Sequence, residues 1–217
     1  MSRLLGILLF GLIAACSAET PAPVAPAGTA SDFVAGEDWF PIEPPAPALA
    51  GDRIEVIEVF GYSCIHCANL QPEVDEWKGR LPADVQFEYM PAVFGGVWEA
   101  YARAYYTAET MGLLERTHDA LFRAIHEERR PFRNLEDIAG FYADYGVSRE
   151  QFLATMSSFP VEAKLARARE MVPAWGVEAT PTMVVAGKYR VPVAHQGGFG
   201  RMLRVVDHLV RVERAAR

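Results

Sequence analysis

Two cysteines, Cys64 and Cys67, stand where a predicted strand meets a predicted helix, and this placement constrains the fold more than any other feature of the chain. The β-branched, apolar run 53–60 before them predicts a buried strand, and residues 64–79 predict a helix. A helix N-terminus has free N–H groups and partial positive charge, so it stabilises a thiolate. His66 between the cysteines adds positive charge when it is protonated. The motif therefore predicts thiol–disulfide exchange, with Cys64 as the attacking sulfur.

The composition of the chain excludes several other classes of function. Its 217 residues suffice for one domain with a sizeable core, or for a core with an insertion. The net charge is −7 and there is no basic run, which argues against nucleic acid as a partner. Three cysteines are too few for a framework of structural disulfides. A zinc site would need a second ligand pair, and the other histidines are scattered, so we expect no metal and no cofactor beyond a redox-active Cys64–Cys67 disulfide.

Residues 1–15 have the pattern of a signal peptide, with an apolar run from Leu4 to Ile13 that is too short to span a bilayer as a helix. The segment Ile13-Ala14-Ala15-Cys16 resembles a bacterial lipobox, in which cleavage exposes the cysteine and its thiol is lipidated. Residues 16–50 would then be a lipidated cysteine and an Ala- and Pro-rich tether. The alternative is an ordinary signal peptide with Cys16 incidental. Both interpretations place the protein outside the cytoplasm, where a disulfide catalyst would act.

The remainder of the chain changes from strand patterns to helical patterns and back. A second strand is predicted at 85–90 and is ended by Pro91. Turn and capping residues then divide a helical block into 97–111, 113–128, 134–145, a short helix that begins with a capping box at Ser148, and 161–174. A hairpin is predicted at 182–186 and 188–191, followed by a closing helix at 200–213. The order is strand–helix–strand, a block of helices, two strands and a helix.

That order is similar to an α/β thioredoxin fold with an all-helical domain inserted between the second and third core strands. With the Cys64-Ile65-His66-Cys67 motif in place, residues 52–213 resemble the DsbA family of periplasmic thiol oxidases. The resemblance implies a thioredoxin-like domain formed by 51–94 and 175–217, with an inserted helical domain at 95–174.

The residues around the predicted site carry the resemblance further. The family typically has proline where Ile65 stands, and the histidine that stabilises its thiolate is kept as His66. Thr180-Pro181 stands before the hairpin, where thioredoxin-fold enzymes have a cis-proline facing the CxxC motif. The resemblance implies that Thr180, Pro181 and Ile65 bind an extended substrate segment. The alternative for Pro181 is an ordinary trans turn.

Glu58 is an acid within an otherwise apolar strand, six residues before Cys64, where DsbA proteins have a buried glutamate. The resemblance implies that burial raises the pKa of Glu58 and that its carboxyl takes or passes a proton near Cys67. In the family a lysine on the neighbouring strand accompanies this acid, and Tyr89 stands at that position here. The alternative is that Glu58 points to solvent at the strand end. Lys78 is expected on a solvated face.

The resemblance implies a periplasmic enzyme of a Gram-negative bacterium that introduces disulfides into unfolded exported proteins. The implied catalytic residues are Cys64, Cys67, His66 and Glu58. A DsbB-like membrane quinone reductase would reoxidise the pair, a lipid on Cys16 would anchor the chain, and a monomer would leave the site open to protein substrates. Thr180 keeps the opposite direction open, because thioredoxins and periplasmic isomerases often have threonine there. A non-catalytic, chaperone-like binding protein is a further alternative, against which the intact CxHC motif argues.

Overall fold

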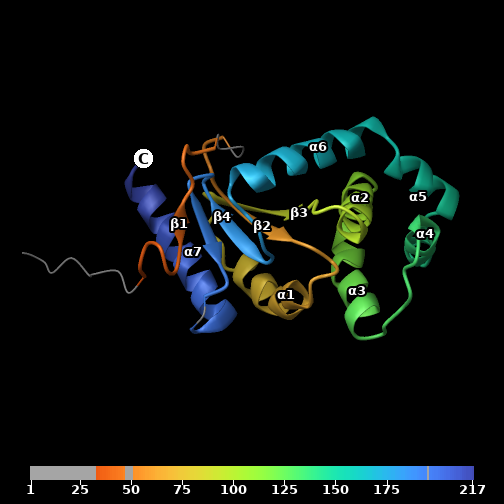
Figure 1. Cartoon of the computed structure of the whole chain (residues 1–217), viewed down its shortest axis with the longest axis horizontal. Helices are drawn as coiled ribbons and strands as arrows, with labels where there is room; N and C mark the ends of the chain where they lie inside the picture. Colours follow the sequence, from red (N-terminus) through yellow and green to blue (C-terminus); the bar gives the residue numbers. More distant parts are fainter. Residues whose placement is uncertain (1–32, 47–50, 195) are drawn as a thin grey trace, which may run out of the picture. The chain divides into compact units, whose positions relative to one another are not determined.

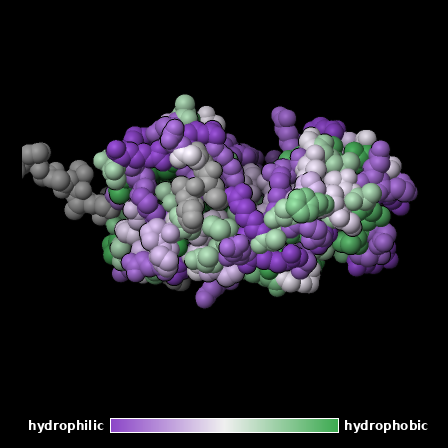
Figure 2. Space-filling view, turned by 90° about the horizontal axis from the view of Figure 1, so that it is seen from above, coloured by the Kyte–Doolittle hydropathy of each residue, from purple (hydrophilic) through white to green (hydrophobic). Residues whose placement is uncertain are grey.

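The computed structural model describes residues 33–46, 51–194 and 196–217. The predicted signal peptide 1–15, the predicted lipidation site Cys16 and most of the predicted tether lie outside the described residues. Among the described residues, no helix is long and apolar enough to cross a membrane. The face shown in Figure 2 mixes hydrophilic and hydrophobic residues without a continuous hydrophobic band.

A mixed sheet forms the centre of the described structure (Figure 1). Its strands in chain order are β1 (Phe40–Pro41), β2 (Ile54–Phe60), β3 (Val85–Pro91), β4 (Thr182–Val185) and β5 (Tyr189–Pro192). In space they follow the order β1-β5-β4-β2-β3. Strand β2 pairs parallel with β3 and antiparallel with β4, and the β4–β5 and β5–β1 pairs are antiparallel. Because every residue of β2 is buried, this central strand places Glu58 inside the protein.

Helices cover the sheet and form a separate block between β3 and β4 (Figure 1). They are α1 (Ile65–Lys78), α2 (Val97–Thr110), α3 (Leu114–His126), α4 (Leu135–Ala143), α5 (Arg149–Met156), α6 (Phe159–Ala174) and α7 (Gly198–Ala215). Side chains of α1 and α7, among them Leu70 and Met202, pack with Ile54 and Val56 in one buried cluster. A second cluster joins Ile57 of β2 to the helices of the block.

The predicted thioredoxin fold is confirmed, with a helical insertion between the second and third core strands, which are labelled β3 and β4 here. Helix α5 begins at the predicted capping box, in which Ser148 and Gln151 each bond the other's backbone N–H. Helix α6 begins at Phe159, two residues before the predicted start. Pro160 causes this earlier start, because proline has no N–H to lose and suits the first turn of a helix.

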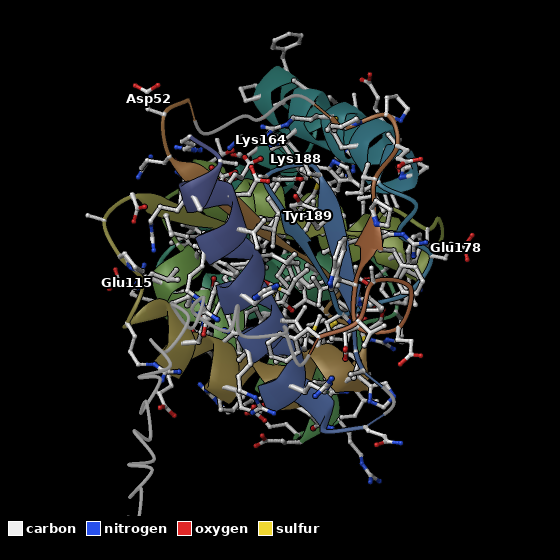
Figure 3. The ribbon with its side chains drawn as sticks, turned by 90° about the vertical axis from the view of Figure 1, so that its left-hand side faces the viewer. Asp52, Glu115, Lys164, Glu178, Lys188 and Tyr189 are labelled. Atoms are coloured by element: carbon white, nitrogen blue, oxygen red, sulfur yellow. The ribbon has the colours of Figure 1, made fainter. Side chains whose placement is uncertain are left out.

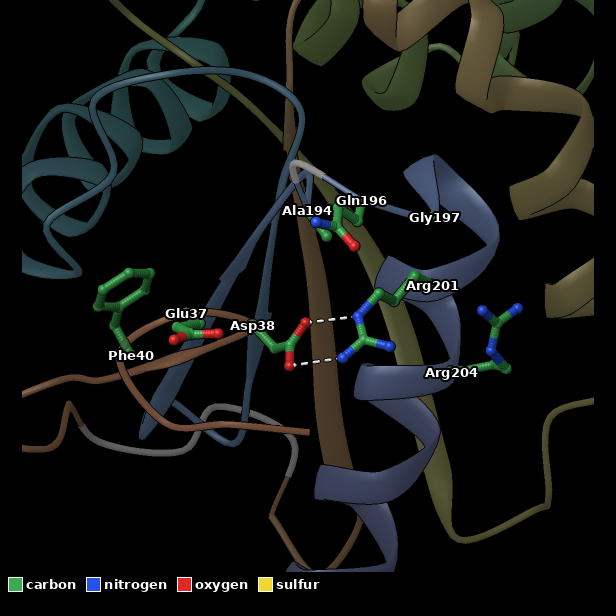
Figure 4. A pocket seen from close by; sticks show the side chains of 9 residues that line it. Glu37, Asp38, Phe40, Ala194, Gln196, Gly197, Arg201 and Arg204 are labelled. Carbon is green, nitrogen blue, oxygen red and sulfur yellow. Dashed lines mark hydrogen bonds and ion pairs between the residues drawn. The ribbon is translucent and has the colours of Figure 1, made fainter. Parts of the chain in front are cut away.

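The segment 33–46, which the sequence placed in the tether, packs on the sheet. Strand β1 pairs with β5, and the Ile42 N–H donates to the Lys188 carbonyl at 2.7 Å. Tyr189, labelled with Lys188 at the β4–β5 turn in Figure 3, makes an edge contact with Trp39. Asp38 forms a two-pronged ion pair with Arg201 of α7, with nitrogen–oxygen distances of 2.6 and 2.8 Å (Figure 4). These contacts attach the segment to both the sheet and α7.

Candidate active site

The turn between β2 and α1 places the first cysteine at a helix N-terminus. Cys64 is the residue that caps α1, and its own N–H bonds the Gly61 carbonyl at 3.0 Å. The Cys67 N–H points at the Cys64 Sγ, 3.4 Å away. A side chain at Gly61 would collide with the Trp98 ring, since a Cβ there would lie 2.1 Å from it. The absence of a side chain at Gly61 therefore lets α2 approach the turn closely.

The two sulfurs have opposite environments although they are one helical turn apart. The pKa of Cys64 falls to about 5, chiefly because the Cys67 thiol hydrogen-bonds its sulfur, with help from Thr180 and from the backbone amides of Cys67 and His66. Burial raises the pKa of Cys67 far above that of an ordinary thiol, because its side chain has 0% exposure. At neutral pH, Cys64 is therefore a thiolate and Cys67 a thiol that donates to it.

The structure shows the backbone contribution and the exposure of His66, and the predicted effect of its charge on the thiolate stays a prediction. Its backbone amide helps to lower the pKa of Cys64. The residue itself is exposed and lines a pocket of about 240 Å³ together with Thr180, Pro181 and Val193. Backbone amides of the helix N-terminus thus add to the Cys67 hydrogen bond, which stabilises the thiolate most, and His66 lines the space beside the proline.

Thr180 and Pro181 lie next to the reactive sulfur. The peptide bond between them is cis, and the Cys64 Sγ lies 3.4 Å from the Thr180 carbonyl oxygen. Strand β4 starts immediately afterwards, at Thr182, whose hydroxyl donates to the Ala179 carbonyl at 2.8 Å. Ile65, 47% exposed, lies on the other side of Cys64 in a groove between α1 and α3. The structure thus brings Cys64, Ile65, Thr180 and Pro181 together at one accessible site.

Glu58 lies on the buried side of the same site. It is 1% exposed, and its Oε2 has no hydrogen-bond partner among the described residues. Burial raises the pKa of Glu58 to about 8, and the charge of Lys78 partly opposes this increase. Glu58 in turn contributes to the raised pKa of Cys67. A carboxyl group with these properties can hold a proton near neutral pH and exchange it with a neighbouring sulfur.

Lys78 of α1 supplies a positive charge that acts on Glu58, where the neighbouring strand β3 has Tyr89 instead of a lysine. Tyr89 is the register partner of Glu58 on β3. Its hydroxyl accepts hydrogen bonds from Lys78 Nζ at 3.0 Å and from Gln71 Nε2 at 2.9 Å. Lys78, whose side chain is 31% exposed, therefore lies partly in solvent and also contacts Tyr89. Its spacing of seven residues from Gln71 places both on one face of α1, a signal that could have identified the pair.

Two other features of the described structure lie apart from the thiols. A hollow of about 620 Å³ is lined by Asp38, Arg201 and Arg204 and by neither cysteine nor Pro181 (Figure 4). Within the described ranges, no group of three or more His, Cys, Asp or Glu residues is arranged to hold a metal ion.

Comparisons with known proteins agree with this geometry. A family model described as a DSBA-like thioredoxin domain matches residues 90–199. The thiol:disulfide interchange protein DsbA of Pseudomonas aeruginosa is 39% identical over 190 residues, which are 88% of this chain and 90% of the relative. This chain belongs to the DsbA family. It is a thiol:disulfide oxidoreductase.

Solved structures of DsbA proteins extend the match to three dimensions. The crystal structure of Pseudomonas aeruginosa DsbA has a TM-score of 0.81 and 39% identity, with 86% of this chain and 97% of that chain covered. The oxidoreductase DsbA from Xylella fastidiosa has a TM-score of 0.79 and 42% identity, with 84% and 98% covered. The DsbA fold of this chain is thus shared over nearly the full length of both relatives.

Proposed function

We propose that this protein is a periplasmic disulfide oxidase that introduces disulfides into exported proteins through Cys64 and Cys67. The observation that carries the proposal is the opposite shift of the two thiol pKa values, down to about 5 for Cys64 and upward for Cys67. A stabilised Cys64 thiolate favours the reduced form of the pair, so the disulfide is a strong oxidant. Each pKa unit corresponds to about 1.4 kcal/mol, or about 30 mV for a two-electron couple.

The reaction proceeds in two exchanges. A substrate thiolate attacks the Sγ of Cys64 in the oxidised pair, the Cys64–Cys67 bond breaks, and a mixed disulfide forms. Cys67 leaves as a thiolate, and we propose that Glu58 gives it a proton, since both groups are buried and their charges repel. The second substrate thiolate then attacks the substrate sulfur of the mixed disulfide, and Cys64 leaves as a thiolate. Two electrons pass from the substrate to the pair.

The accessible side of the site is the proposed substrate cleft. Thr180 and Pro181 would present backbone groups to an extended segment, in the manner of β-strand addition, with Ile65 and His66 on either side of Cys64. The pocket beside Pro181 supports this assignment, because it opens directly next to the residues that contact the Cys64 sulfur. We assign the cleft to a thioredoxin-like domain of residues 51–94 and 175–217, with a helical domain at 95–174.

The proposed export and anchor come from the pattern of residues 1–16, and the proposed reoxidising partner comes from the family. We propose a signal peptide at 1–15, lipidation of Cys16, and reoxidation by a DsbB-like quinone reductase in the membrane of a Gram-negative bacterium. A monomer suits an enzyme whose cleft must accept other proteins. Mass spectrometry of the mature N-terminus tests the anchor: a lipid-modified Cys16 supports it, and a free thiol or cleavage elsewhere rules it out.

The direction of exchange is tested by two measurements on the reduced protein. The rate of Cys64 alkylation, followed from pH 3 to 9, is expected to have a midpoint near 5 because the thiolate is the reactive form. Equilibration with glutathione is expected to give a potential well above that of thioredoxin, about −270 mV. An ordinary thiol midpoint together with a thioredoxin-like potential would overturn the oxidase assignment in favour of a reductase or isomerase, the direction that Thr180 also permits.

A further inference from the structure

Tyr62, two residues before Cys64, is held by two histidines of the helical block. Its hydroxyl lies 2.8 Å from His118 Nδ1, and its backbone carbonyl oxygen lies 2.7 Å from His126 Nε2. Both histidines belong to α3 and are eight residues apart, so they lie on one face of the helix, about two turns from each other. Tyr62 itself belongs to the turn between β2 and α1.

The protonation of these groups follows from their partners. A carbonyl oxygen only accepts hydrogen bonds, so His126 must carry a proton on Nε2 and donate it to Tyr62. Burial lowers the pKa of His118 to about 3, so this ring is neutral at physiological pH. The bond from His126 is therefore a directed contact from the end of α3 to the backbone of the active-site turn.

Burial and aromatic packing of the Tyr62 side chain hold the position of its backbone. The side chain is 1% exposed and packs against Phe60, Tyr101 and Phe122. The carbonyl that His126 holds belongs to the peptide group between Tyr62 and Ser63. Cys64 follows Ser63, so the conformation of this turn sets the direction in which the Cys64 sulfur points.

We propose that His126 is a positioning residue for Cys64. By holding the Tyr62 carbonyl, it fixes the turn so that the Cys64 sulfur stays at the N–H groups that begin α1. Those groups stabilise the thiolate more than they stabilise a neutral disulfide sulfur. His126 therefore makes the pair more oxidising, and it connects the helical block to the chemistry of the thioredoxin-like part. The inference rests on the proposed function only in taking Cys64 as the reacting thiol.

Three variants of the full chain test the role of His126. The His126→Ala variant is expected to raise the pH midpoint of Cys64 alkylation. It should also lower the equilibrium constant for oxidation of glutathione by the Cys64–Cys67 disulfide about two- to tenfold, the size that one hydrogen bond supplies. His126→Gln should restore both values, because its Nε2 can donate to the same carbonyl. His208→Ala is the control, since His208 contacts Phe33 from α7.

Two results would overturn the inference: an unchanged midpoint and equilibrium constant in His126→Ala, or an equal shift in the Ala and Gln variants. If the Ala variant does not fold, His126→Asn replaces it, because this amide is one methylene too short to reach the carbonyl. The outcome is separate from that of the proposed function. An ordinary thiol midpoint with a thioredoxin-like potential in the unmodified protein would overturn only the oxidase assignment, whereas differences between the variants and the unmodified protein decide the role of His126.

Discussion

The active site has two sides that differ in exposure, although their two cysteines are only one helical turn apart. The open side comprises Cys64, His66 and Thr180, which are exposed or partly exposed, and the buried side comprises Cys67 and Glu58. On the open side, hydrogen bonds lower the pKa of a thiol to about 5, even though burial opposes them. On the buried side, loss of water raises the pKa of a thiol and of a carboxyl. The chain thus separates the group that leaves as an anion from the groups that carry protons.

The difference between the two sides also shows how they depend on each other. The largest cause of the low pKa of Cys64 is the hydrogen bond from Cys67, a residue of the buried side. Cys67 can donate this bond because burial and the nearby carboxyl keep it protonated. The acidity of the exposed sulfur is therefore partly a product of the buried side, and substitutions on either side should reveal this dependence.

Removal of each sulfur should have the largest effect and should distinguish the two sides. Cys64→Ala should abolish substrate oxidation and leave a buried thiol that alkylates slowly. Cys67→Ala should also abolish turnover, but Cys64 should still react with oxidised glutathione and remain as a mixed disulfide. Its alkylation midpoint should rise from about 5 toward, without reaching, that of free cysteine, because the backbone amides remain. Mass spectrometry and the pH profile of alkylation measure these outcomes, and an unchanged midpoint would contradict the dependence on Cys67.

Replacement of the buried acid should have the next largest effect. Glu58→Gln keeps the shape of the side chain and removes its proton chemistry, so we expect exchange to slow about tenfold or more. Stopped-flow measurement of the step in which Cys67 leaves provides the test, with Glu178→Gln, an exposed acid in the loop before β4, as the control. Equal rates in the unmodified protein and the Glu58 variant would leave Glu58 without a catalytic role.

The same variant should change how the stability of the reduced protein depends on pH. The depressed pKa of Cys64 makes the folded state bind fewer protons than the unfolded state between about pH 5 and 9, so stability rises with pH there. The raised pKa of Glu58 has the opposite effect between about 4.5 and 8. The two effects oppose each other in the unmodified protein. In Glu58→Gln the Cys64 gain is no longer opposed by Glu58, and it amounts to about 1 to 2 kcal/mol at pH 7 after solvent screening. Urea unfolding at several pH values above 6.5, where the lowered pKa of His118 no longer contributes, measures how this gain grows with pH.

Much of the fold could be predicted from the sequence because local signals agree with the final structure. Ser148 and Gln151 mark the start of α5, and Pro91 ends β3. Strand β1 could not be predicted in this way. A strand of two residues has no alternation to detect, and its pairing with β5 arises from contacts far apart in the sequence.

The parts of the site that depend on spacing along the chain could be predicted. Hydrogen bonds between side chains and residues of other helices or strands could not. The distance from Glu58 to Cys64 along the chain matches that of the buried glutamate in DsbA proteins, so the resemblance indicated the buried acid. The Lys78–Tyr89 bond depends on the packing of α1 against β3, so the spacing of Gln71 and Lys78 places both on one face of α1 but does not identify Tyr89 as their partner. The same holds for the bond from His126 to Tyr62, which joins α3 to the β2–α1 turn.

The Lys78 contact leads to the smallest effect that we predict. Its positive charge lowers the pKa of Glu58, so Lys78→Met should raise that pKa further above the value of about 8. Lys78→Arg keeps the charge and should leave the pKa near its original value, and Lys164→Met, which removes a lysine paired with Glu109 in the helical block, is the matched control. The titration of the Glu58 carboxyl carbon by NMR measures the shift. Because Lys78 is partly exposed and also pairs with Asp75, water and that carboxylate screen its charge, and the shift should be less than about one unit. An unchanged titration in Lys78→Met would mean that burial alone sets the pKa of Glu58 and that the buried side of the site acts without a lysine partner.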